Sequence, residues 1–238
     1  MARWGGYLVQ KSRGQAAIVI LLGPVGVGKS TQIALLSNYF HKRKNRTVTT
    51  FIKSNHVFSY FLRAALVLLG CSEKIFYPDG TPIVCPKGRV VRRLLPLLAI
   101  FDAVSIAIKF FFEVFIPFHF GFTVLIEEGP AMTLHTYSVC YPEFFKTKPR
   151  VVRLSHILLG WVLSKAHAQI VMDTTDAELI ERRKSREFRR TELPEYVISQ
   201  RKWVQSINLQ GTFRIETTNK SIAEVHKTIV NVLEENVN

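Results

Sequence analysis

Residues Gly23 to Ser30, with the sequence GPVGVGKS, decide how this chain folds, because they match the phosphate-binding pattern GxxxxGK[ST] in full. The glycines of this pattern let backbone N–H groups surround a phosphate, and the start of the following helix adds its dipole. Lys29 is expected to reach the β- and γ-phosphates of a nucleoside triphosphate, and the Ser30 hydroxyl to ligand Mg²⁺. The residues expected to hold the triphosphate are Gly23, Val25, Gly26, Val27, Gly28, Lys29 and Ser30.

The residues on either side of this loop fit the same prediction. Residues 16–22 (AAIVILL) form a continuous apolar run of strand length, which is typical of a strand buried on both faces. Residues 31–40 are expected to form a helix directly after the loop. A buried strand, a glycine-rich loop and a helix in this order make a chance match to the pattern improbable, although they leave the phosphoryl acceptor undetermined.

Strands alternate with helices along the rest of the chain. Further strands are predicted at 47–52, 122–126, 169–172 and 212–215, and helices at 57–70, 90–116, 154–167, 176–190, 194–207 and 221–235. Residues 71–88 contain several Pro and Gly residues and are expected to form a loop or a hairpin. This order predicts an α/β fold with a five-stranded parallel sheet between two layers of helices, as one domain over 1–238.

Composition limits the classes of protein to which this chain can belong. The chain has 238 residues, 47% of them hydrophobic, which is enough apolar material for a sizeable core and excludes global disorder. Three cysteines without CxxC spacing make a disulfide framework or a zinc ribbon improbable, so a reducing compartment, the cytoplasm, is expected. A net charge of +14 indicates attraction to polyanions such as nucleotides, nucleic acids or acidic lipids.

The apolar residues 94–126 raise the question of a membrane span. Asp102, Lys109 and Glu113 interrupt the stretch, so a buried helix followed by a buried strand is expected and no transmembrane span. Attachment to a membrane surface stays open as an alternative, since Phe110, Phe111 and Phe112 could insert while basic residues contact anionic lipid.

Acidic residues at the end of a central strand are candidates for holding Mg²⁺, often through water. Glu127 and Glu128 follow the predicted strand 122–126, and Asp173 follows the strand 169–172 as a second choice. Glu127 is the predicted metal residue and could instead act as a base on the acceptor. Each carboxylate could also be a helix cap or a surface group.

A densely basic segment follows Asp173. Arg182 and Arg186 lie four residues apart and share one face of the predicted helix, with Arg183 beside them. Arginines that close over a phosphate site stabilise the charge that spreads over the transferring phosphoryl group. A solvated helix or a nucleic-acid-binding patch would have the same composition.

The order of these motifs resembles the thymidylate kinase family of nucleoside-monophosphate kinases over residues 16–233. The resemblance includes the loop with its trailing Thr31, LLAIFD at 97–102, Thr136-Tyr137, and the run from Met172-Asp173 to Arg186. It implies a three-layer P-loop NTPase fold with an Arg-rich lid at about 181–194. It also implies ATP and Mg²⁺ as cofactors, and it suggests a homodimer.

The resemblance assigns roles to further residues. Thr31 would contact the α-phosphate, Arg182, Arg183 and Arg186 would form the lid, and the loop from Thr217 to Lys220 would lie beside the adenine. Catalytic roles fall to Lys29, Glu127, Arg182 and Arg186, and acceptor-binding roles to Lys53, Phe101 and Asp102.

This chain departs from the family at three positions that orient the acceptor. Val25 stands where the family has Asp, Ala103 where it has Arg, and Glu128 where it has Arg. A carboxylate in place of an arginine would repel a monophosphate instead of binding it. The sequence therefore predicts a Mg²⁺- and ATP-dependent phosphotransferase of the nucleotide-kinase type with an altered acceptor site.

A second hypothesis is a P-loop ATP-binding protein without kinase activity that acts through nucleic acid or a protein partner. The net charge and the three departures motivate it, and basic clusters at 42–46, 87–93 and 146–153 would supply phosphate contacts. No helix-turn-helix, zinc-finger or RNA-binding signature accompanies these clusters.

Overall fold

The computed structural model describes residues 16–52, 61–62, 64–65, 68–70, 72–76, 82–86, 89–129, 132–133, 135, 160–161, 164–184, 194–206 and 212–237. The predicted helices 57–70 and 154–167 fall largely outside these residues. Further predicted features lie wholly outside the described residues: Lys53, Arg186, residues 185–193 of the predicted lid, and the basic cluster 146–153.

A five-stranded parallel sheet forms the centre of the molecule, as predicted. Its strands are β1 (Ile18–Leu22), β2 (Thr47–Phe51), β5 (Thr123–Glu127), β6 (Ala168–Asp173) and β7 (Thr212–Glu216), in the order β2-β5-β1-β6-β7. All five residues of β1 are buried, which explains why its sequence is apolar without alternation. Because β5 and β6 pair with opposite edges of β1, the crevice at the carboxyl end of β1 is where ligands of such sheets bind.

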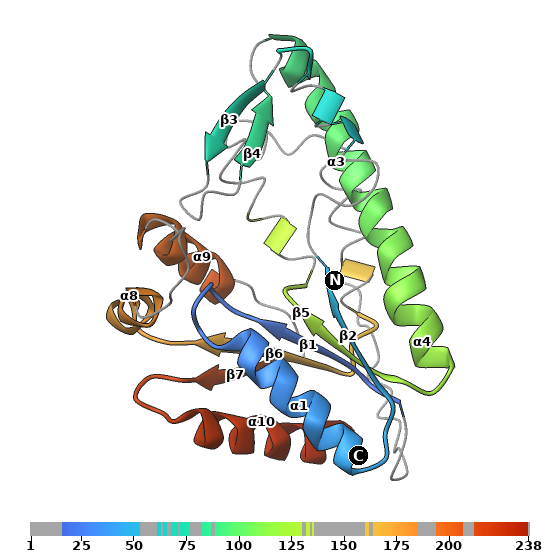
Figure 1. The fold of residues 1–238 in the computed structure, drawn as a ribbon, viewed down its shortest axis with the longest axis vertical. Helices are drawn as coiled ribbons and strands as arrows, with labels where there is room; N and C mark the ends of the chain where they lie inside the picture. The colour runs from blue at the N-terminus through green and yellow to red at the C-terminus, as the bar shows by residue number, and fades with distance from the viewer. Residues whose placement is uncertain are drawn as a thin grey trace, which may run out of the picture.

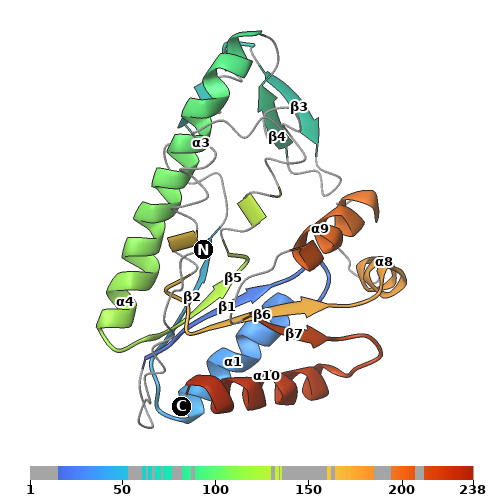
Figure 2. The same ribbon diagram turned by 180° about the vertical axis from the view of Figure 1, so that it is seen from behind.

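Helices cover both faces of this sheet and produce three layers (Figure 1). Helices α1 (Lys29–Lys42) and α10 (Ile222–Val237) lie together on one face, over a core that includes Leu36, Ile170 and Ile229. The opposite face is covered by α3 (Arg89–Phe110) and its continuation, over a second core that includes Ile20, Phe110 and Ile126. Figure 2 shows the same layers from behind.

The predicted long helix 90–116 is a continuous helical rod with a local change of pitch. After α3 the chain makes a π-helical turn, η1 (Phe111–Phe115), and then a short helix, α4 (Ile116–His119). Pro96 lies inside α3, as the eighth residue of this helix. The segment 71–88 forms an antiparallel hairpin of β3 (Ser72–Phe76) and β4 (Pro82–Pro86).

Two further helices lie beyond the carboxyl end of the sheet. They are α8 (Asp176–Lys184), which follows β6, and α9 (Pro194–Ser206). None of the described helices combines the length and apolar character required to cross a membrane.

The loop after β1 comes close to the backbone of β6. A Cβ atom at Gly23 would lie 2.5 Å from the carbonyl oxygen of Met172 and 2.9 Å from Cγ1 of Val27. The first of these atoms belongs to a central strand, so it cannot move aside cheaply. Glycine at position 23 therefore lets the loop lie directly against β6.

We expect Gly23→Ala to lower the free energy of unfolding by about 2–3 kcal/mol, through the clash with Met172 and a backbone conformation unfavourable for alanine. Gly121→Ala is the matched control, because Gly121 also has a positive φ of 81° but a Cβ atom added there would meet no atom within 4 Å. The control should lose only about 1 kcal/mol. Equal urea-denaturation midpoints for the two variants would contradict the close contact.

Candidate functional site

The loop Gly23–Ser30 curls as its sequence predicts. Gly26 and Gly28 adopt φ angles of 95° and 105°, in the left-handed region that glycine accepts without a steric cost. Helix α1 begins at Lys29, and Gly28 is its N-cap residue. The amino end of α1, with its positive dipole, therefore follows the loop directly.

A side chain from α9 also supports the loop. The Val25 N–H donates to Oε1 of Gln200 at 3.0 Å, and Gln200 is fully buried. These residues are 175 positions apart. Neither composition nor a local pattern marks Gln200, so sequence reasoning missed it.

Lys29 is buried and folds back over its own loop. Its Nζ donates to the carbonyl oxygens of Gly23 at 2.9 Å and Pro24 at 3.0 Å. It also forms an ion pair with Oε1 of Glu128 at 3.3 Å, and both side chains are less than a tenth exposed. The Lys29 ammonium is thus held at the end of β5, where the predicted phosphate site and the strand-end carboxylates meet.

The two residues predicted to hold the metal lie in direct contact. The Ser30 hydroxyl donates to Oε1 of Glu127 at 2.6 Å. A hydroxyl and a carboxylate are hard oxygen ligands of the kind Mg²⁺ prefers, and Mg²⁺ usually keeps waters and substrate phosphates as its other ligands. The pair therefore fits Mg²⁺ bound with a nucleotide. In the described part of the chain, no group of three or more His, Cys, Asp or Glu residues could hold a metal ion by itself.

Asp173, the second choice for the metal, has a different role in the structure. Its carboxylate accepts from Nε of Arg201 at 2.8 Å and from Nε2 of Gln205 at 2.8 Å, which fastens α9 to the end of β6. Its Oδ1 also accepts the Thr174 N–H at 2.9 Å. Hydrogen bonds to Asp173, above all, and to Asp176 raise the pKa of Arg201, so this guanidinium stays charged at every relevant pH.

A pocket of about 530 Å³ opens beside the loop. Among the predicted nucleotide-binding residues it is lined by Gly26, Val27, Gly28, Thr31, Arg182, Thr217 and Lys220. These residues come from the loop, α1, α8 and the segment between β7 and α10. The residues that sequence reasoning missed in its lining are Gln32, Met172, Glu178, Ser221, Ile222 and Val225.

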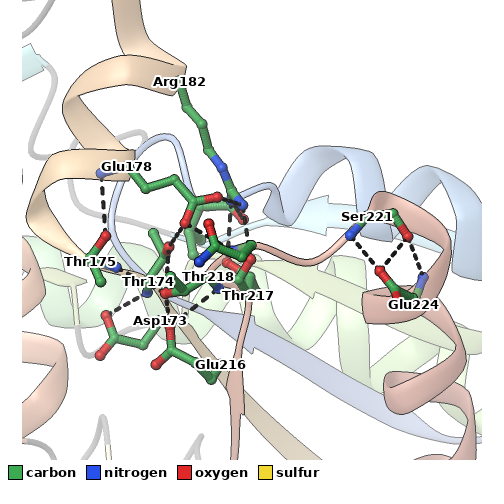
Figure 3. A network of polar contacts seen from close by, with 12 residues as sticks. Asp173, Thr174, Thr175, Glu178, Arg182, Glu216, Thr217, Thr218, Ser221 and Glu224 are labelled. Carbon is green, nitrogen blue, oxygen red and sulfur yellow. Dashed lines mark hydrogen bonds and ion pairs between the residues drawn. The ribbon is translucent and has the colours of Figure 1, made fainter.

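Arg182 joins the two sides of this pocket (Figure 3). Its Nη1 donates to the Val27 carbonyl at 3.3 Å and to the Thr217 hydroxyl at 3.2 Å, and its Nη2 donates to the Thr217 carbonyl at 2.9 Å. An ion pair with Glu178 on the same helix holds the guanidinium in place. Arg182 thereby lies along the wall of the pocket, against the segment expected to lie beside the adenine.

Glu178 is the centre of the polar network drawn in Figure 3. Its Oε2 accepts from the Thr174 hydroxyl at 2.8 Å and from the Asn219 N–H at 3.2 Å. Burial alone would raise the pKa of Glu178, but the hydrogen bonds from Thr174, Asn219 and Arg182 outweigh it and lower the pKa. An ionised Glu178 therefore connects α8 to the loop between β7 and α10.

Two of the residues predicted to bind the acceptor lie on α3. Asp102 is fully buried on α3 and Phe101 is half-buried beside it. Arg183 lies within α8, but its side chain is outside the description. Buried His135 lies with its Nε2 at 3.1 Å from the Ser199 hydroxyl, next to Gln200 on α9, and is not among the predicted residues.

Comparisons with known proteins agree with this architecture. No protein-family model matches the chain, and no curated protein sequence matches it. Among solved structures, the chain is similar to a thymidylate kinase from Candida albicans, with a TM-score of 0.59 and 12% identity, covering 93% of this chain and 92% of that chain. That structure is described as revealing the origin of broad substrate specificity and a novel structural element. A likeness at this identity defines the architecture, and the chain has a thymidylate kinase-like fold.

Proposed function

We propose that this chain is a Mg²⁺- and ATP-dependent phosphotransferase of the nucleotide-kinase type whose acceptor site differs from that of thymidylate kinases. One observation carries the proposal: a pocket extends from the phosphate loop to Thr217 and Lys220, and Ser30, at the end of that loop, contacts Glu127. Its volume of about 530 Å³ lies within the range of about 300–1,000 Å³ that is usual for ligand pockets.

The nucleotide would lie along this pocket, with its base beside the wall formed by Arg182 and the Thr217–Lys220 segment and its phosphates in the loop. The exposed Thr31 at the start of α1 would contact the α-phosphate. Backbone N–H groups of the loop and the amino end of α1 would surround the β-phosphate. Lys29 would exchange its two loop carbonyls for the β- and γ-phosphate oxygens, over a short movement of its flexible stem.

Catalysis would consist of positioning and charge stabilisation. Ser30 and Glu127 would hold Mg²⁺ with the nucleotide, and the metal would supply positive charge to the phosphates. Ser30 would be its direct ligand, and Glu127 would orient one of its waters. Arg183 and Arg186 would close over the transferring phosphoryl group. Arg182 was predicted to close over it with them, but its guanidinium contacts Val27, Thr217 and Glu178, so its proposed role is to hold α8 beside the pocket.

The acceptor side supports the altered specificity. Glu128 is buried beside Lys29 and has a φ of 53°, unusual for a residue with a side chain. A buried carboxylate at the end of β5, beside the phosphate loop, opposes a second anionic group in the acceptor. An uncharged hydroxyl acceptor is the better match to this environment.

We expect Lys29→Ala to lower ATP-dependent phosphoryl transfer about 100-fold or more, because the β- and γ-phosphates lose their cation. ADP release from Mg·ATP, measured over a panel of nucleosides and nucleoside monophosphates, checks this. If the unchanged protein binds ATP but no acceptor stimulates ADP release, the result contradicts a kinase and favours an ATP-binding module.

Lys29→Ala also removes the cation beside the buried Glu128 carboxylate, at a cost of about 3–5 kcal/mol in stability. The double variant Lys29→Ala/Glu128→Gln removes both charges and serves as the control for folding. It should regain most of the lost stability and remain inactive. Activity restored together with stability would show that Lys29 is structural only.

Glu127→Gln should raise the Mg²⁺ concentration needed for half-maximal activity by about 10–100-fold, as expected for a residue that orients a metal-bound water. Glu235→Gln, which removes an exposed carboxylate on α10, is the matched control and should behave like the unchanged protein. A Mg²⁺ dependence unchanged by Glu127→Gln would contradict the assignment of this residue to the metal.

A further inference from the structure

The amino ends of the strands form a surface that the nucleotide site does not use. Parallel strands begin at one edge of a sheet and end at the other, and the pocket lies at the carboxyl edge. At the amino edge, the Thr123 N–H donates to the Arg46 carbonyl at 2.8 Å and the His167 N–H to the Ile18 carbonyl at 2.8 Å. In Figures 1 and 2, α4 lies beside this edge and on the side of the molecule opposite α8 and α9.

Large aromatic side chains are exposed at this edge and on the helical segment that leads to it. Phe112 in η1 is 61% exposed, Phe120 after α4 is 69% exposed and Trp161 is 46% exposed. Phe112 contacts Phe111, which is itself 47% exposed and stacks on Phe115, while Trp161 and Phe110 form a separate pair of rings. Clustered exposed aromatics of this size are unusual on a protein that meets only water and indicate a contact surface.

Basic side chains flank these rings. The Arg46 guanidinium lies 4.9 Å from the ring centroid of Phe122, two residues after Phe120, and the Lys165 ammonium lies 5.5 Å from that of Trp161. Lys44, two residues before Arg46, is exposed in a left-handed conformation. We call the set Phe112, Phe120, Trp161, Lys44, Arg46 and Lys165 the aromatic–basic edge.

Two carboxylates near these aromatic and basic side chains are paired. Glu113 in η1 lies 3.6 Å from Lys109 and accepts from the Thr50 hydroxyl. Glu234 near the end of α10 is held by Arg43 at 2.6 Å and accepts from the Tyr39 hydroxyl at 2.7 Å. The aromatic–basic edge is therefore positive where its rings are exposed, in a chain whose net charge is +14.

We propose that the aromatic–basic edge docks on an anionic lipid bilayer. Phe and Trp rings match the boundary between headgroups and acyl chains, and Lys and Arg beside them match the negative lipid headgroups. A second copy of this chain fits less well, because it would bring the same basic side chains face to face. Docking through the amino edge leaves the nucleotide pocket, at the opposite edge, open to solvent.

The test is co-sedimentation of the full chain with vesicles of phosphatidylcholine, alone or with about one-third phosphatidylglycerol, at physiological ionic strength. We expect binding to the anionic vesicles only, and weaker binding at higher salt. Phe112→Ala/Phe120→Ala should reduce the partition coefficient about tenfold or more, because two rings no longer insert. Lys44→Glu/Lys165→Glu should reduce the partition coefficient about 20-fold or more, because each basic residue lost near the surface weakens binding about fivefold.

Matched controls separate this surface from the overall charge. Lys202→Glu/Lys227→Glu makes the same charge change on α9 and α10, and Leu68→Ala removes an exposed apolar side chain outside the edge. Both controls should bind vesicles within about twofold of the unchanged chain. Thermal unfolding followed by circular dichroism shows whether each variant is folded. A variant that unfolds is replaced by Phe112→Ser or Lys165→Gln alone, each a smaller change at the same edge.

Three results would overturn the proposal. The unchanged chain could remain in the supernatant with anionic vesicles. The control charge reversal could weaken binding as much as the reversal at the edge, which would make the attraction non-specific. Light scattering could show a dimer that the Phe112→Ala/Phe120→Ala variant dissociates and no vesicle binding, which would assign the edge to a second copy.

Discussion

The contact between Gly23 and the backbone of Met172 is the constraint on which the site depends. It lets the loop after β1 lie against β6, with no room for a side chain between them. Only from this position does the loop lead into α1 beside the end of β5, where Lys29 meets Glu128 and Ser30 meets Glu127. The pocket beside the loop depends on the same contact, because Met172 is also part of its lining.

The site is held together by interactions between elements that are distant in sequence. Arg201 and Asp173 fasten α9 to β6, and Gln200 on the same helix reaches the Val25 N–H in the loop. Arg182 and Glu178 connect α8 to the loop and to the Thr217–Asn219 segment. Helix α8 is thus anchored beside the pocket by polar contacts to both of the pocket's walls.

Much of the fold was predictable because its signals are local. The apolar run of β1, the glycine-rich loop and the strand-end position of Glu127 follow from residues that are neighbours in the chain, and the structure places them as expected. The contact between Ser30 and Glu127 was predictable from the rule that parallel strands end at one edge. Gln200, Glu178 and the role of Asp173 were not, because they depend on how α8 and α9 pack, and no local pattern encodes that packing. The π-helical turn at Phe111–Phe115 was also missed, since its sequence is compatible with an ordinary α-helix.

The loop and the pocket beside it should together bind a nucleoside triphosphate with Mg²⁺, and every proposed role in phosphoryl transfer depends on this binding. Hydrogen–deuterium exchange with and without Mg·ATP tests it at the level of individual segments. We expect slower exchange at 25–32 and at 217–221, with no change at 119–122 on the opposite edge of the sheet. Protection confined to other segments, or no protection at saturating Mg·ATP, would contradict nucleotide binding at this site.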